Sequence, residues 1–264
     1  NRPAVCDRET AARATQKAFD EIARIEARMS PYREGSDISK IARSHGPVMV
    51  SPETFSLVSQ SVEISRLTGG AFDISFASVA RLWNYKNPGF IPPSDVALDR
   101  ARGLVDYRKI TLDEKALTVR LAPGMKIGLG GIAKGYAVKR AVEVLMAEGV
   151  DSGIAEEGGD LQVFGSKNGG PWITGLMHPR EKNLVLSIEL GHLDSVATSG
   201  DYERYAEYEG KRYGHIINPL TGRPAEGMAS VSVFSKDPVV SDAYATAFFV
   251  MGARKTAEFL ESHH

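Results

Sequence analysis

The sequence has a single cysteine, Cys6, in 264 residues. One thiol cannot close a disulfide within the chain or build a cysteine-rich zinc site. The sequence also lacks any apolar run close to the ~20 residues that cross a bilayer. Its 32 basic and 33 acidic residues give a net charge of −1, which argues against a protein that binds nucleic acid through bulk positive charge.

Common catalytic signatures are missing as well. The chain has no G-x-S-x-G, C-x-x-C, H-E-x-x-H or G-x-x-x-x-G-K-S/T pattern, so the usual motifs of hydrolases, zinc enzymes and P-loop proteins are absent. What is present is the composition of a folded globular protein, with 42% hydrophobic and 25% charged residues.

The residues at both ends of the sequence indicate how the chain was produced. The chain begins at Asn1 rather than methionine and shows no signal peptide, so we expect that a leader has been removed. The final His263 and His264 are expected to be the remnant of a purification tag.

Apolar periodicity and capping residues predict three helices and a hairpin in the first part of the chain. An apolar stripe predicts a helix over 9–29, and Ser51 followed by Pro52 predicts a second helix that runs to Leu67. A polar stretch, 36–44, lies between them. The runs "KITL" and "ALTVRL" predict a hairpin, and the Gly-rich turn 128–131 precedes a third helix that stops at Gly149.

From Asp151 to Phe234 the pattern changes to short β-rich runs, and a last helix is expected to begin near Ser241, its N-cap. Strands that cluster after helices, without regular βαβ alternation, favour an α+β fold. We therefore predict a single domain over 1–264 that can divide into two lobes, with a mixed or antiparallel sheet flanked by helices.

Asp242 and Thr246 lie four residues apart on the last predicted helix, so their oxygens share one face. Both are hard donors that suit Mg²⁺. A structural interpretation also holds, because an acid in a first helical turn favours the dipole and a threonine within a helix often bonds to its own backbone.

The turn "GLGGIAKG" can cradle a phosphate, because a Gly-rich loop that opens a helix presents backbone N–H groups. Lys134 and Arg140 add positive charge. The turn also fits G-x-G-x-x-A, with Asp151 at the spacing of a ribose-binding acid, so a dinucleotide fold is an alternative. A tight turn for close helix packing is the structural interpretation.

His215, beside the turn in "GHIINPLTGRP", could serve as a general base or be an ordinary structural histidine. The segments "TGGAFDIS" and "VATSGDYERY" suit close approach to a ligand and equally suit turns. Tyr32, Phe72, Trp83 and Tyr85 could stack on a flat ring or pack in the core.

The chain carries, in order, the motifs "YREGSDISKI", "TGGAFDIS" with "LWNY", "LGGIAKGYAV", "GGDLQVFG", "VATSGDYERY", "HIINPLTGRP" and "SDAYATAFFVMG". This ordered series closely resembles the ApbE family of flavin transferases. The resemblance runs from about Phe19 to Gly252, nearly the whole chain. A series of motifs in the right order is far more specific than any one of them.

The resemblance implies transfer of the FMN half of FAD to a Thr or Ser hydroxyl of a target flavoprotein, with Mg²⁺ as cofactor, FAD as substrate in a cleft between lobes, and release of AMP. The implied Mg²⁺ ligands are Asp242, Thr246 and the backbone oxygen of Ala137. The implied proton acceptors are His215 and Asp73. The implied FAD-binding residues are Tyr32, Ala71, Phe72, Asp73, Lys134, Arg140, Thr198 and Ile217.

Four positions depart from the pattern of the family. Gly128 and Lys139 stand where the family usually has acids, Glu157 stands in place of an Asn, and Asn218 in place of an Asp. Two alternatives therefore stay open: FAD hydrolysis to FMN and AMP by water, and an FAD-binding or assembly protein with little catalysis.

By resemblance we expect a periplasmic protein that is lipid-anchored in its full-length precursor, although no lipobox surrounds Cys6. We also expect a membrane-associated target and no nucleic-acid partner.

Overall fold

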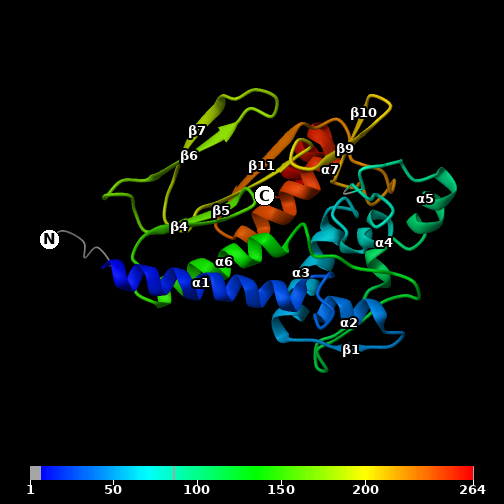
Figure 1. Cartoon of the computed structure of the whole chain (residues 1–264), viewed down its shortest axis with the longest axis horizontal. Coiled ribbons are helices and arrows are strands. Elements are labelled where there is room, and N and C mark those ends of the chain that lie inside the picture. The colour runs from blue at the N-terminus through cyan, green and yellow to red at the C-terminus, as the bar shows by residue number, and fades with distance from the viewer. Residues whose placement is uncertain (1–6, 86, 264) are drawn as a thin grey trace. The chain divides into compact units, whose positions relative to one another are not determined.

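The computed structural model describes residues 7–85 and 87–263 (Figure 1). Cys6 and His264 therefore lie outside the described residues. The chain divides into two compact units, each assembled from separate stretches. Unit 1 holds the described residues up to Ala27, Ile132–Thr198 and Ser232–Ala245, and unit 2 holds Arg28–Gly131, Ser199–Val231 and the residues from Thr246 onward.

Helices and short strands alternate in the first half, and strands dominate the second half before a final helical segment that is interrupted by non-helical backbone at Gly252. The helices are α1 (Arg8–Met29), α2 (Asp37–Arg43), α3 (Pro52–Leu67), α4 (Ala77–Ala80), α5 (Asp95–Arg102), α6 (Ala133–Ala147) and α7 (Pro238–Ser262), with 3₁₀ turns η1 (Ile74–Phe76) and η2 (Tyr107–Lys109). The strands are β1 (Val48–Met49), β2 (Thr111–Asp113), β3 (Thr118–Arg120), β4 (Gly153–Glu157), β5 (Asp160–Phe164), β6 (Trp172–Met177), β7 (Leu184–Leu190), β8 (Ser195–Gly200), β9 (Tyr205–Tyr208), β10 (Lys211–Gly214) and β11 (Ser230–Ser235).

The structure confirms most predicted elements. α3 begins at Pro52, and the Ser51 hydroxyl accepts from the Thr54 N–H at its N-terminus, as the sequence predicts. The hairpin forms from β2 and β3, which pair antiparallel. The polar stretch 36–44 contains α2, in which the Ser39 N–H donates to the Ser36 hydroxyl at the N-cap.

The predicted start of the last helix is wrong. α7 begins at Pro238, three residues before Ser241, because the Asp237 carboxylate accepts from the Val239 N–H and takes the capping role. The Ser241 hydroxyl instead lies 2.8 Å from the hydroxyls of Ser195 and Ser235. Ser241 therefore joins α7 to the sheet.

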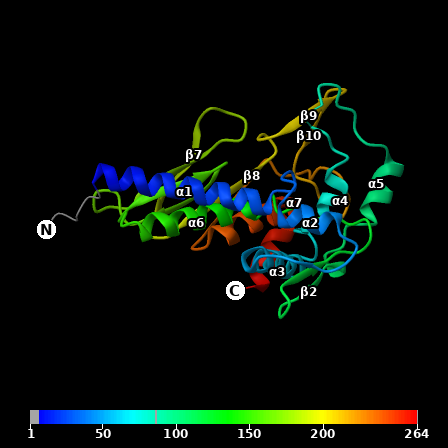
Figure 2. The same ribbon diagram turned by 60° about the horizontal axis from the view of Figure 1, so that its bottom comes forward.

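Unit 1 has three layers (Figures 1 and 2). The sheet β11-β8-β5-β4 is covered on one face by α6, with α1 alongside it. The hairpin β6–β7 covers the other face through a cluster that includes Val163, Val196 and Leu190. Since both faces of β5 are covered, its first residue, Asp160, begins in the interior.

Unit 2 contains the small sheet β1-β3-β2, helices α2 to α5 and the hairpin β9–β10. An aromatic cluster of Trp83, Tyr85, Phe90 and Tyr213 forms part of its core. The Trp83 indole N–H donates to the Gly222 carbonyl at 2.9 Å. Trp83 is therefore a core residue here, and the half-buried Tyr85 packs against that core.

The fold is α+β with antiparallel pairing, as predicted, for example between β4 and β5. The dinucleotide alternative is wrong, because the chain between β3 and α6 contains no strand and "GLGGIA" is part of a loop. No helix in 7–85 or 87–263 combines the length and apolar character needed to cross a membrane.

Candidate active site

The first turn of α6 places Lys134 between two buried carboxylates of unit 1. Its ammonium group lies 3.2 Å from Asp242 Oδ1 and forms a still closer ion pair with Asp160 Oδ2. Asp160 and Asp242 are only 1% and 3% exposed. Burial alone would lower the pKa of Lys134, but the two carboxylates outweigh it and raise that pKa. The cluster therefore keeps a half-buried positive charge between two buried acids.

The second carboxylate oxygen of Asp242 accepts a hydrogen bond from the backbone of α6. Asp242 Oδ2 accepts from the Gly135 N–H at 3.0 Å, and Ile132 at the N-cap supplies no side-chain cap. A Cβ on Gly135 would lie 2.2 Å from the Pro238 carbonyl oxygen, so this position requires glycine. The helix N-terminus that the sequence suggested for a phosphate is thus partly occupied by a carboxylate.

Glu157, at the end of β4, adds a third acid near this cluster. Its Oε2 is buried and has no hydrogen-bond partner among the described residues. Burial raises the pKa of Glu157, the Lys134 charge opposes that rise, and Glu26 and Asp242 add to it. Acids thus outnumber the lysine here, an arrangement that favours an additional cation.

The sequence did not single out Asp160, although it lies in the motif "GGDLQVFG". Burial and the neighbouring Asp242 charge raise its pKa, against the effect of Lys134. The Thr198 backbone N–H also donates to it, while the Thr198 hydroxyl lies 2.8 Å from the Ser232 hydroxyl. The usable signal was an acid that directly follows two glycines at the start of a buried strand.

Two other residues of unit 1 that the resemblance implies, Arg140 and Ala137, make contacts that stabilise the fold. Arg140 pairs with Glu21 of α1 and with Glu143 of its own helix, so its guanidinium helps to dock α1 on α6. Ala137 is buried in the second turn of α6, where a backbone carbonyl normally accepts from the N–H four residues on. Their predicted contacts with FAD and Mg²⁺ stay predictions.

Asp73 in unit 2 is a buried hydrogen-bond acceptor. Its Oδ1 accepts from the Ser75 N–H and hydroxyl, and its Oδ2 accepts from the Tyr107 N–H at 2.9 Å. Burial raises the pKa of Asp73, while these donors oppose the rise. Asp73 therefore fixes η1 and η2 relative to each other, which makes it better suited to positioning than to taking a proton.

Other predicted residues of the same unit lie around the turn "TGGAF". Ala71 and Phe72 are buried, and the Phe72 N–H donates to the Thr68 hydroxyl. A Cβ on Gly131 would lie 3.3 Å from the Phe72 ring and 3.1 Å from Thr246 Oγ1, so Gly131 allows a close approach. Thr246 Oγ1 also lies 3.5 Å from the Ser199 hydroxyl.

His215 has a defined tautomer. Its Nδ1 lies 3.1 Å from the Arg204 carbonyl oxygen, and since a carbonyl can only accept, Nδ1 carries the proton. In the neutral ring Nε2 is then the basic nitrogen. Ile217 is buried in the core and forms a β-bridge with Pro224, and Tyr32 is 93% exposed in the turn after α1.

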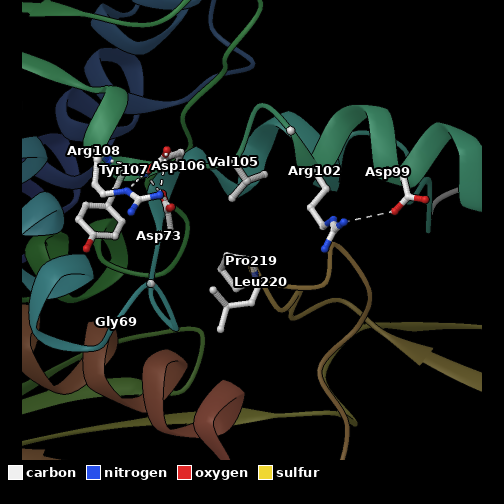
Figure 3. Close-up of a pocket in the computed structure, with 12 residues that line it drawn as sticks. Gly69, Asp73, Asp99, Arg102, Val105, Asp106, Tyr107, Arg108, Pro219 and Leu220 are labelled. Atoms are coloured by element: carbon white, nitrogen blue, oxygen red, sulfur yellow. Dashed lines mark hydrogen bonds and ion pairs between the residues drawn. The ribbon is translucent and has the colours of Figure 1, made fainter.

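Unit 2 has a pocket of about 470 Å³ (Figure 3). Asp73, Asp106 and Arg108 lie on one side of it and Pro219 and Leu220 on the other. The Arg108 guanidinium binds both oxygens of Asp106 and shapes that wall. A cavity of this size holds a small ligand or part of a larger one.

The four departures have local physical reasons or consequences. A Cβ on Gly128 would lie 3.3 Å from Ala77 Cβ, so an acid there would be crowded. Lys139 forms an ion pair with Asp237 at 2.8 Å. Asn218 Oδ1 accepts from the Leu220 N–H, so the turn keeps the bond that an Asp would make. Glu157 supplies the extra acid described above.

The structure thus brings Lys134 together with Asp242 in unit 1 and places Phe72 and Thr246 at the same glycine in unit 2. The FAD cleft between lobes stays a prediction. Among residues 7–85 and 87–263 there is no group of three or more His, Cys, Asp or Glu side chains arranged to hold a metal ion. A cation at Asp242 would therefore take further ligands from elsewhere.

Known proteins resemble this chain over nearly its whole length. The ApbE family model matches residues 4–264. The FAD:protein FMN transferase of Vibrio cholerae is 30% identical over 270 residues, which cover 99% of this chain and 79% of the relative. That of Treponema pallidum is 32% identical over 266 residues, which cover 94% and 74%.

Solved structures agree. The ApbE protein of Thermotoga maritima gives a TM-score of 0.90 at 34% identity and covers 95% of this chain and 82% of its own. The flavinyl transferase ApbE of Pseudomonas stutzeri, in its apo form, gives 0.84 at 28% identity, with coverage of 95% and 80%. The family predicted from the ordered motifs is confirmed by sequence and by fold, and this chain belongs to the ApbE family.

Proposed function

We propose that this chain transfers the FMN half of FAD to a Thr or Ser hydroxyl of a target flavoprotein and releases AMP. The observation that carries the proposal is that relatives named FAD:protein FMN transferase match 99% and 94% of the chain. The cluster of Lys134, Asp160 and Asp242 supports it, because a half-buried lysine beside buried acids suits phosphate and cation chemistry.

Mg²⁺ is the proposed cofactor, with Asp242, Thr246 and the Ala137 carbonyl as ligands. The donor set fits, because hard oxygens suit Mg²⁺ and the orphaned Oε2 of Glu157 leaves nearby negative charge unmatched. Mg²⁺ commonly uses one or two carboxylates and completes its shell with phosphate oxygens and water. When bound, it would supply stabilisation of the charge that develops on the departing AMP.

The chain's own residues account for the remaining chemistry. The acceptor hydroxyl forms a new P–O bond to the FMN phosphorus, and the bond from that phosphorus to the bridging oxygen breaks, so the oxygen leaves with AMP. His215 accepts the hydroxyl proton at Nε2, since its Nδ1 is held by the Arg204 carbonyl. Lys134 pairs with phosphate oxygens, and Asp73 holds the segment around Phe72 in place.

We place this reaction in the periplasm, with a lipid anchor in the full-length precursor and a membrane-associated flavoprotein as target. The support is the motif resemblance alone.

Intact-mass spectrometry of a target fragment tests the transfer. After incubation with this protein, FAD and Mg²⁺, the fragment should gain one FMN, and the gain should disappear when the acceptor Thr is changed to Ala or EDTA is added. AMP release without a target would instead identify an FAD pyrophosphatase. Bound FAD without AMP, and no gain of mass, would identify a binding or assembly protein.

Asp242→Asn tests the metal assignment. Asparagine keeps an acceptor for the Gly135 N–H but removes the negative charge, so transfer should fall by about 100- to 1,000-fold. Asp237→Asn is the matched control, because Asp237 pairs with Lys139 and an amide oxygen still accepts from the Val239 N–H. Wild-type rates for Asp242→Asn in metal-controlled buffer would refute the assignment.

A further inference from the structure

The ammonium group of Lys134 occupies the place where a cation would approach Asp242. Asp242 Oδ2 already accepts from the Gly135 N–H, so Oδ1 is the oxygen that remains for a cation. Lys134 Nζ lies 3.2 Å from that Oδ1. A divalent ion at Oδ1 and an ammonium group at the same atom repel each other, and the low dielectric of the interior strengthens the repulsion.

Asp160 offers Lys134 a second carboxylate. It is the closer partner of the ammonium group, is 1% exposed, and is fixed at the start of β5 by the Thr198 backbone N–H. When Lys134 loses Asp242, it can remain paired with Asp160 instead of becoming an unpaired, half-buried charge. Loss of one partner from such a pair is costly when no other partner replaces it.

We propose that Lys134 competes with a divalent cation for Asp242 Oδ1, and that Asp160 is a positioning residue that retains the displaced ammonium group. The inference rests on the proposed Mg²⁺ site at Asp242. Asp160 then strengthens cation binding through Lys134, without being a ligand. Lys134 weakens cation binding as long as no phosphate group pairs with its ammonium group.

The test measures Mn²⁺ affinity of the full, FAD-free chain by electron paramagnetic resonance of the free ion. Lys134→Gln keeps N–H donors for both carboxylates but removes the charge, so it should bind Mn²⁺ about tenfold more tightly. Asp160→Asn should bind about tenfold more weakly. In the double variant the loss caused by Asp160→Asn should shrink, because the lysine through which Asp160 acts is gone.

Lys139→Gln is the matched control. Lys139 lies on the same helix, its side chain is 37% exposed like that of Lys134, and it pairs with Asp237 rather than Asp242. Its Mn²⁺ affinity should stay within about twofold of wild type. If Lys134→Gln binds no more tightly than Lys139→Gln, the competition does not exist. An undiminished effect of Asp160→Asn in the double variant would show that Asp160 acts on the ion directly.

Asp242→Asn separates this inference from the metal assignment. Wild-type chain that binds no Mn²⁺, or Asp242→Asn that binds as well as wild type, would overturn both. Binding that is lost in Asp242→Asn but unchanged in the Lys134 and Asp160 variants would overturn the inference alone. Thermal unfolding in EDTA and in Mn²⁺ gives a second readout, in which Lys134→Gln should gain more stability from Mn²⁺ than wild type does.

Discussion

At the scale of single residues, local roles were predictable and long-range partners were not. Ser51 caps α3 as its sequence context predicts, since a cap depends on residues three positions away. Lys134 meets Asp160 and Asp242, which lie 26 and 108 positions along the chain, so no local pattern could pair them. Helical spacing and the Gly-rich turn singled out Asp242 and Lys134, the resemblance to a family gave them roles, and only the fold revealed Asp160.

Gly135 carries a prediction at this scale. Gly135→Ala would place a Cβ 2.2 Å from the Pro238 carbonyl oxygen, so α6 and α7 must separate and the bond to Asp242 weakens. We expect a loss of ~2–3 kcal/mol in the free energy of unfolding, typical of overpacking against a backbone. Thermal unfolding measures it. The control is Gly130→Ala, whose Cβ would meet no atom within 4 Å; equal melting temperatures of the two variants would disprove the packing argument.

At the scale of elements, periodic and capped segments were predictable, and segments held by tertiary contacts were not. The apolar periodicity of α1 and the two β-rich runs around the polar turn of the β2–β3 hairpin can be recognised in the sequence. α2 lies in a polar stretch, yet Asp37 is buried and accepts from the Ser51 N–H and the Thr54 hydroxyl. α7 starts early because Asp237, not Ser241, makes the capping bond. The contacts of Asp37 reach 14 and 17 positions along the chain, beyond a local sequence window, whereas the Asp237 cap is a local bond that the sequence does contain.

The contact of α1 with α6 predicts a pH dependence. Glu21 accepts hydrogen bonds from Arg24 and Arg140, which hold its pKa at about 2 in the folded chain, below the ordinary 4.5. A lowered pKa means that this stabilisation is complete above about pH 4.5 and is lost as pH falls towards 2. Because both arginines are more than a third exposed, we expect ~1 kcal/mol rather than the full value of the shift.

Melting curves of Glu21→Gln and wild type at several pH values check this dependence. The variant should melt ~2–4 °C lower at pH 7, and the gap should close as the pH approaches 2. Glu63→Gln is the control, because Glu63 pairs with Arg66 on the surface and should leave the melting temperature unchanged. A gap for Glu21→Gln that is the same at pH 7 and pH 2 would contradict the assignment.

At the scale of the whole molecule, the fold class was predictable, but which stretches of the chain form each unit was not. The order of helices and strands indicated α+β. That each unit is completed by stretches far apart in sequence follows from packing, which composition does not encode. Unit 1 needs Ser232–Ala245, and unit 2 needs the residues from Thr246 onward.

A chain that ends at Val231 should therefore leave both units incomplete. It lacks most of β11 and all of α7, including Asp242 and the buried Phe249. We expect no cooperative thermal transition by circular dichroism, because Lys134 loses its partner Asp242 and the core of each unit is opened. A sharp transition near that of the full chain would show that the final segments are dispensable.

The position of Lys134 between Asp160 and Asp242 affects how stable the fold is when divalent cations are scarce. A site that carries its own tethered positive charge needs no external ion to hold its two nearest carboxylates together. Unlike a zinc finger, which loses its fold with its metal, this chain should remain folded and resistant to proteases when magnesium runs short. On the proposed Mg²⁺ dependence, folded chains that lack the ion would regain activity when Mg²⁺ returns, without new protein synthesis.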